Sequence, residues 1–243
     1  MIAADLTEGT LLGGRVRHFQ PRDGHRTALE PVLLAAAIPA RPGQRVLEGG
    51  TGAGGALLCL AARVAGLGGL GIERDPGMAE IARYNLEANG LTGLTVETAD
   101  LTQWTSASRF DHAFANPPWH DPSGTASPDR RRDAARRATP ALFAAWAMAL
   151  APVLRPRGTL SFILGADHLA DGMAALIAAG CGSVSICPLW PKLGRPARLV
   201  VLQAIRGGAG PTRLLPGLVL HQADGSFTPA ADAILREGGA LVV

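Results

Sequence analysis

The stretch Asn116-Pro117-Pro118-Trp119 carries the residues of this sequence whose types and order best suit chemistry. An amide or aniline-like NH2 is a poor nucleophile because its lone pair is delocalised. The Asn116 side-chain oxygen and the Pro117 carbonyl can both accept hydrogen bonds from such an NH2. That arrangement favours a pyramidal nitrogen, which can attack a sulfonium methyl group in line. Trp119 offers a face on which a flat base or amide can stack. An ordinary Asn-Pro-Pro turn that closes a strand is the alternative interpretation.

A short apolar run, residues 110–115, precedes this stretch and predicts a buried strand. The two prolines cannot donate hydrogen bonds to a strand ladder, so the strand should end before them. Asn116 then follows the carboxyl end of a strand, where ligands bind in open α/β sheets. We therefore predict that residues 116–119 form the catalytic segment.

A glycine-rich segment follows the first predicted core strand, residues 44–48, and leads into a predicted helix. Its glycines, Gly50, Gly52 and Gly54 among them, allow a tight turn and a close approach of backbone to a ligand. The helix that follows presents free N–H groups. Glu73 ends the next predicted strand, nineteen positions after Gly54, where it can accept hydrogen bonds from both ribose hydroxyls of a nucleoside. The spacing also satisfies G-x-G-x-x-G, so a nicotinamide or flavin site is the alternative.

Two features favour S-adenosylmethionine over a dinucleotide. Glu48, at the tip of the first strand, suits a cationic ligand such as the amino group of S-adenosylmethionine and would be unfavourable beside a pyrophosphate. The Asn-Pro-Pro-Trp stretch, in turn, has no role in hydride transfer. Asp100 follows a third predicted strand and can accept from an adenine amino group, with Leu101 packing on the ring; a turn-forming aspartate is the alternative. The predicted cofactor-binding residues are Glu48, Gly50, Thr51, Gly52, Gly54, Glu73, Asp100 and Leu101.

Two polar segments are candidates for binding the substrate. The loop before the helix predicted over residues 30–37 could fold over the site, or it could simply be solvated. Residues 129–137 hold five arginines and two aspartates, directly after the catalytic segment, where the backbone of a polyanionic substrate would run. A solvated helix start with an i, i+4 pair is the alternative there. The predicted substrate-binding residues are His25, Arg26, Arg130, Arg131, Arg132 and Arg136.

The remaining pattern predicts one α/β domain with additions at both ends. We expect an N-terminal hairpin and helix (residues 1–40) packed on a core (41–205), and a C-terminal extension of the same domain (206–243). The hairpin turns at Gly13-Gly14. Further helices are predicted over 56–64, 76–89, 141–154 and 169–179, and further strands over 69–73, 94–97, 159–164, 183–187 and 198–204.

Composition limits the class of protein. The chain has 243 residues, of which 47% are hydrophobic and 18% charged, so it can bury a full core. Its three cysteines fit no zinc spacing, and we see neither a secretory signal nor a membrane helix. A cytoplasmic, reduced and metal-free protein is the simplest expectation. Of 23 basic residues only Lys192 is lysine, which reflects codon usage as readily as nucleic-acid binding.

With these residues in hand, the sequence resembles a class I S-adenosylmethionine-dependent methyltransferase. More closely, it resembles the bacterial tRNA adenine-N6 methyltransferases that act beside the anticodon of a valine tRNA. The resemblance rests on the glycine-rich segment with Glu48, on Glu73 and Asp100, on residues 116–119, and on the tail at 215–228. The group usually has aspartate at the position of Glu48, and tyrosine or another aromatic residue at the position of Trp119. It tends to have an aromatic pair where this chain has His25 and Thr27, and an acidic residue where it has Arg137 and Ala138.

The resemblance implies a Rossmann-like fold: a seven-stranded, mostly parallel sheet with helices on both faces, its last strand antiparallel, and a short C-terminal extension. It implies S-adenosylmethionine as cofactor, S-adenosylhomocysteine as product, and RNA, in particular tRNA, as partner, without a membrane or a metal. Oligomeric state stays open. The alternatives are methylation of a protein glutamine side-chain amide, a non-catalytic methyltransferase-like RNA-binding domain and, last, an NAD(P)-dependent oxidoreductase.

Overall fold

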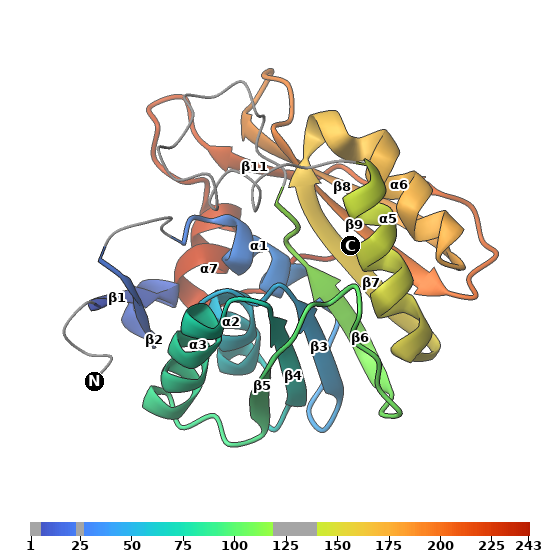
Figure 1. The fold of residues 1–243 in the computed structure, drawn as a ribbon. Coiled ribbons are helices and arrows are strands. Elements are labelled where there is room, and N and C mark those ends of the chain that lie inside the picture. The colour runs from blue at the N-terminus through green and yellow to red at the C-terminus, as the bar shows by residue number, and fades with distance from the viewer. Residues whose placement is uncertain (1–5, 23–26, 119–139) are drawn as a thin grey trace, which may run out of the picture.

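The computed structural model describes residues 6–22, 27–118 and 140–243 of the chain. The described residues form a central sheet of nine strands with helices on both faces (Figure 1). Across the sheet the order is β10 (Arg213–Leu214), β8 (Cys181–Lys192), β9 (Leu199–Arg206), β7 (Leu154–Gly165), β6 (Phe110–Ala115), β3 (Arg45–Gly49), β4 (Gly68–Glu73) and β5 (Leu94–Thr98), and β11 (Leu218–His221) also pairs with β8.

The seven core strands follow the expected pattern. β9 is antiparallel to both of its neighbours, β7 and β8, and the other core pairs are parallel. The expected strand count needs correction, because two short strands of the C-terminal extension, β10 and β11, add to the outer edge of β8 in parallel. Neither carries a strong local signal, and both form through pairing with a distant strand.

Helices cover the two faces of the sheet as separate groups. α1 (Glu30–Ala37), α2 (Gly55–Arg63), α3 (Pro76–Ala88) and α7 (Pro229–Glu237) enclose one buried cluster, and α5 (Pro140–Leu150) and α6 (Leu169–Ala178) enclose the other. Figure 1 shows the first group on the left and the second on the right. Alternate strand residues supply each cluster: Phe114 faces the first, and Ala113 and Ala115 face the second.

Two predicted bounds were wrong in the same region. The helix predicted over residues 141–154 ends at Leu150 and continues as a 3-10 turn, Ala151–Val153. Pro152 explains this because it has no N–H for the helical ladder. β7 then starts at Leu154 rather than at 159, and it contains a register irregularity opposite β6.

The N-terminal hairpin is confirmed, with β1 (Leu6–Leu11) antiparallel to β2 (Val16–Pro21) and positive φ at Gly13 and Gly14 between them. The hairpin and α1 contact the C-terminal segment. Arg15 donates a hydrogen bond to the carbonyl of Glu237, and the Leu241 N–H donates to the carbonyl of Ala36 at 2.8 Å. These contacts support the proposal that the terminal segments belong to one domain with the core.

Within the described part of the chain, no helix has the length and apolar character needed to cross a membrane.

Candidate active site

The predicted cofactor and catalytic segments meet at one edge of the sheet. Gly49 of β3 pairs with Ile72 of β4 on one side and with Ala115 of β6 on the other. The loops that leave these parallel strands therefore start side by side. The glycine-rich turn, Glu73 and Asn116 consequently lie on neighbouring strands at the same level, as the sequence predicts.

The glycine-rich turn adopts the backbone that only glycine takes readily. Gly50, Gly52 and Gly54 have φ of 66°, 55° and 86°, and Gly54 is the N-cap of α2. The N–H of Thr51 donates to the carbonyl of Ile72 at 3.0 Å, which fixes the turn against β4. A Cβ at Gly52 would meet nothing within 4 Å, so this part of the turn is open to a ligand.

The Glu73 carboxylate supports the same turn from β4. Its Oε2 accepts from the N–H of Gly52 at 2.9 Å, and its Oε1 accepts from the N–H of Asp75 at 2.9 Å. Each carboxylate oxygen retains a second acceptor position. The geometry therefore fits the predicted role, in which the two oxygens also accept hydrogen bonds from the ribose hydroxyls of a nucleoside.

Glu48 lies deeper than the sequence suggests, with only 3% of its surface exposed. Its Oε2 accepts from the Thr51 hydroxyl at 2.5 Å, and the Leu57 N–H of α2 also donates to its carboxyl group. Burial raises the pKa of Glu48 to about 8, and the nearby Glu73 charge adds to this, although the two hydrogen bonds oppose it. Glu48 thus connects the glycine-rich turn to the N-terminal part of α2. Its contact with a cationic amino group stays a prediction.

Asp100 and Leu101 follow β5 on the far side of the turn. The hydroxyl and the N–H of Thr102 donate to Oδ1 of Asp100 at 2.7 and 2.9 Å, and these bonds lower the pKa of Asp100. Oδ2 is then the oxygen available to a ligand. Leu101 is buried, and its Cδ2 lies 2.7 Å from where a Cβ on Gly49 would stand.

Trp146 of α5 is a candidate site residue that sequence reasoning missed. Its ring lies over the glycine-rich turn, 2.5 Å from where a Cβ on Gly50 would stand. Glycine is thus required at position 50 by its φ and by the indole. The sequence did offer one sign of this role. Trp146 is an indole in a helix otherwise rich in alanine and leucine, and that helix comes soon after the catalytic segment. With Leu101, Trp146 forms apolar surface beside the turn.

Asn85 of α3, also missed, connects the turn to the N-terminal hairpin. It is fully buried; its Oδ1 accepts from the Phe19 N–H at 2.7 Å, and its Nδ2 donates to the carbonyls of Phe19 and Ala53 at 2.8 and 2.9 Å. Asn89, one turn later, makes the equivalent pair of bonds with the N–H and carbonyl of Arg17, at 3.0 and 2.8 Å. The hairpin is thereby held against the cofactor side of the fold.

The catalytic segment is only partly described. Asn116 is half-buried and Pro117 is buried, immediately after β6. Pro118, which follows, is half-buried. The remaining predicted residues of the catalytic and substrate-binding sets lie outside the described residues: Trp119, His25, Arg26, Arg130, Arg131, Arg132 and Arg136.

Comparison with known proteins agrees with this geometry. The family described as Methyltransferase small domain matches residues 31–141. The tRNA1(Val) (adenine(37)-N6)-methyltransferase of Shewanella sediminis is 30% identical over 155 residues, which are 61% of this chain and 63% of the relative. The enzyme of the same name from Tolumonas auensis is 26% identical over 220 residues, 90% and 91% of the two chains. For the relatives from Shewanella sediminis and Cronobacter sakazakii, the matched part spans 63% and 48% of their length.

Among solved structures, the protein Atu636 from Agrobacterium tumefaciens, described as a predicted O-methyltransferase, is similar with a TM-score of 0.73 and 26% identity, over 88% of this chain and 99% of that one. The fold, the glycine-rich turn and these matches support a class I S-adenosylmethionine-dependent methyltransferase. Within that class, the chain resembles the tRNA1(Val) (adenine(37)-N6)-methyltransferases.

Proposed function

We propose that this protein transfers the methyl group of S-adenosylmethionine to the exocyclic N6 amine of an adenine in RNA, with tRNA as the substrate class. The observation that carries the proposal is the pairing of Gly49 with Ala115. It starts the glycine-rich turn and the Asn116 segment on adjacent strands, about 4.8 Å apart. A methyl donor over the turn and an NH2 group held by Asn116 would then be close enough to react.

Each residue of the site has a defined task in this proposal. S-adenosylmethionine supplies an electrophilic sulfonium methyl group. Glu73 accepts from the ribose hydroxyls, and Oδ2 of Asp100 accepts from the cofactor's adenine amine. Oδ1 of Asn116 and the carbonyl of Pro117 accept from the target NH2, which directs the nitrogen lone pair toward the methyl group. The nitrogen lone pair forms the N–C bond as the C–S bond breaks, S-adenosylhomocysteine leaves, and the methylated nitrogen releases one proton to water. Catalysis then consists mainly of positioning and alignment.

The substrate side of the proposal rests on residues assigned from the sequence. The target adenine must leave its stack to reach Asn116, and Trp119 then stacks on it. From the sequence, His25 and Arg26 are assigned to contact with the base, and Arg130, Arg131, Arg132 and Arg136 to contact with the phosphates of the strand.

The chemistry of Asn116 favours nitrogen over oxygen as the acceptor atom, although Atu636 is described as a predicted O-methyltransferase. A hydroxyl acceptor needs a base that removes its proton, and a carboxamide is not a base. The carboxamide oxygen is a good acceptor for N–H donors, which is what an amine substrate requires. A protein glutamine amide has the same planar NH2 and is the second outcome of the test below.

The test is one reaction with a variant. Wild-type protein, S-adenosylmethionine and in vitro transcribed tRNA, valine tRNA included, are incubated, and the nucleosides are identified by mass spectrometry. We expect N6-methyladenosine. Asn116→Ala should reduce its formation by about 10²- to 10³-fold, the loss typical of one transition-state hydrogen-bonding group, and calorimetry should show unchanged affinity for S-adenosylhomocysteine.

A 2′-O-methylated nucleoside would contradict the assignment of the acceptor atom. Absence of any RNA product from a protein that binds S-adenosylhomocysteine would move the substrate to a protein amide. Loss of S-adenosylhomocysteine binding in Asn116→Ala would refute the role given to that side chain.

A further inference from the structure

One long segment of the chain is free of acidic residues. Between Asp171 and Asp224 there is no Asp or Glu, but there are five basic residues, Lys192, Arg195, Arg198, Arg206 and Arg213, in a chain whose net charge is only +3. This segment folds into β8, β9, β10 and β11, which form one side of the sheet. The segment that forms that side of the sheet therefore contributes five positive charges and no negative charge of its own.

β8 and β9 also extend beyond the level of the active site. Following the pairing across the sheet from Ala115 leads to Phe162, then Leu202, then Ile186. β8 continues from Ile186 for six more residues to Lys192, which corresponds to about 20 Å. We name residues 187–201 the β8–β9 arm. Figure 1 shows the connection between these strands in orange at the top, on the side toward which β6 runs.

The C-terminal extension braces this arm. β11 pairs with the outer part of β8, from Leu189 to Lys192. The indole N–H of Trp190 donates to the carbonyl of Pro216 at 3.1 Å, and Nζ of Lys192 donates to the carbonyl of Ala223 at 3.0 Å. A Cβ at Gly217 would stand 2.1 Å from the carbonyl oxygen of Pro188, so glycine is needed for this close approach. The arm is consequently held in place rather than left as a free loop.

The cations of this segment divide into two kinds. Arg206 donates to the carbonyls of Pro152 and Leu154, and Arg213 donates to the Ser185 hydroxyl, so these two serve the fold. Arg195 and Arg198 are exposed at the end of the arm. Within residues 6–22, 27–118 and 140–243, neither guanidinium has a hydrogen bond or an ion pair, and both are available to a ligand.

We propose that the β8–β9 arm is a second RNA-binding surface, on which Arg195 and Arg198 contact phosphates of the strand that flanks the target adenine. The inference rests on the proposed function and identifies where the RNA continues beyond the site. A flipped base occupies only the edge near Asn116, but the strand carrying it has a charge at every nucleotide and must pass over neighbouring surface. The arm is braced by β11 on that side, and its own residues include no acid.

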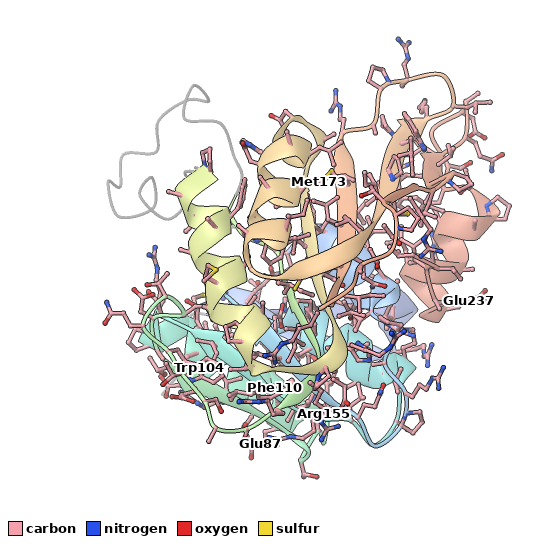
Figure 2. The ribbon with its side chains drawn as sticks, turned by 90° about the vertical axis from the view of Figure 1, so that its right-hand side faces the viewer. Glu87, Trp104, Phe110, Arg155, Met173 and Glu237 are labelled. Carbon is pink, nitrogen blue, oxygen red and sulfur yellow. The ribbon has the colours of Figure 1, made fainter. Side chains whose placement is uncertain are left out.

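The test compares two double variants with the same change in charge. Arg195→Gln/Arg198→Gln removes the arm's free cations. Arg41→Gln/Arg109→Gln removes two exposed cations just before β3 and β6, at the opposite edge of the sheet. Figure 2 shows that edge at the bottom, marked by Phe110 and Arg155. tRNA affinity is measured by filter binding from 50 to 300 mM salt, alongside methylation and S-adenosylhomocysteine affinity.

Each phosphate contact contributes roughly 0.7 to 0.9 to the slope of log K against log salt. Loss of two contacts should lower that slope by about 1.4 to 1.8 and weaken tRNA binding by roughly 25- to 60-fold at 0.1 M salt. S-adenosylhomocysteine affinity should stay the same, and the control variant should keep the wild-type slope.

An unchanged slope in Arg195→Gln/Arg198→Gln, with a wild-type protein that methylates tRNA, would refute the arm proposal and leave the proposed function intact. An equal loss in the control variant would also refute it, because the effect would then follow net charge. A wild-type protein that neither binds nor methylates tRNA would overturn the function and the arm together.

Discussion

The buried carboxamide of Asn85 provides the sharpest test of how this fold holds its cofactor site. Asn85→Ala removes three hydrogen bonds, to the N–H and carbonyl of Phe19 and to the carbonyl of Ala53. Those groups lie where water cannot replace the lost partner, and a net value of about 1 kcal/mol for each bond gives a loss of about 3 kcal/mol in the free energy of unfolding. For a chain of 243 residues this corresponds to a fall of about 6–12 °C in melting temperature.

Asn89→Ala is the matched control. Asn89 also makes three hydrogen bonds, with the N–H and carbonyl of Arg17 and with the carbonyl of Asn85, but it lies nearer to solvent. Water can replace its amide, so we expect a loss of about 1 kcal/mol or less. The count of hydrogen bonds is thus equal, and burial is the variable that differs.

Urea unfolding followed by circular dichroism gives both free energies by linear extrapolation. S-adenosylhomocysteine affinity, measured by calorimetry on the folded variants, should fall for Asn85→Ala because the Ala53 carbonyl belongs to the glycine-rich turn. Equal losses of stability in the two variants would refute the reasoning from burial. A loss below 1 kcal/mol at Asn85 would show that the hairpin is not held by this side chain.

Two further predictions concern the turn itself. Glu48→Gln should stabilise the protein increasingly as pH rises from 4.5 to 8: the pKa of Glu48 is raised to about 8 in the folded protein from an ordinary 4.5, so the native state holds the extra proton and wild-type stability falls through this window. Across this window the difference in free energy of unfolding between the two proteins should change by a total on the order of 3 to 5 kcal/mol. Urea midpoints are measured for both proteins at pH 5, 6.5 and 8. A difference between the midpoints that stays constant with pH would contradict the prediction. Gly50→Ala should weaken S-adenosylhomocysteine binding at least tenfold, roughly the effect of 1.4 kcal/mol, because its new methyl group would stand 2.5 Å from Trp146. Gly52→Ala has a similarly positive φ with open space around it, so equal losses by calorimetry would show that backbone strain, and not the indole, decides.

Local signals predicted most of the core elements. The strand at residues 110–115 and the helix at 30–37 have the predicted bounds, because a proline pair ends the first and apolar residues with Pro39 beyond them define the second. The parallel arrangement of the core strands then follows from their alternation with helices. For the same reason, the sequence correctly predicted that Glu73 ends a strand and that Asp100 and Asn116 each follow one.

The missed features all depend on contacts between distant parts of the chain. Asn85 and Asn89 bond to backbone groups 66 and 72 positions away, and nothing near them in the sequence indicates those partners. In the sequence, Trp146 looks like one more apolar residue of a buried helix. Only the fold shows that it lies over the glycine-rich turn. The strand at Leu218–His221 is four residues long and exists because β8 lies beside it.

The asparagines of α3 have a consequence for how this protein behaves in a crowded solution. A two-stranded ribbon such as β1–β2 leaves unpaired peptide groups along its outer sides, which invite a strand from another chain. A carboxamide carries the same donor and acceptor as a peptide unit, so Asn85 and Asn89 complete the ladder of β2 as a third strand would. Four main-chain groups of Arg17 and Phe19 are thereby closed to foreign strands. The helix thus protects this side of the ribbon from intermolecular β-pairing and aggregation.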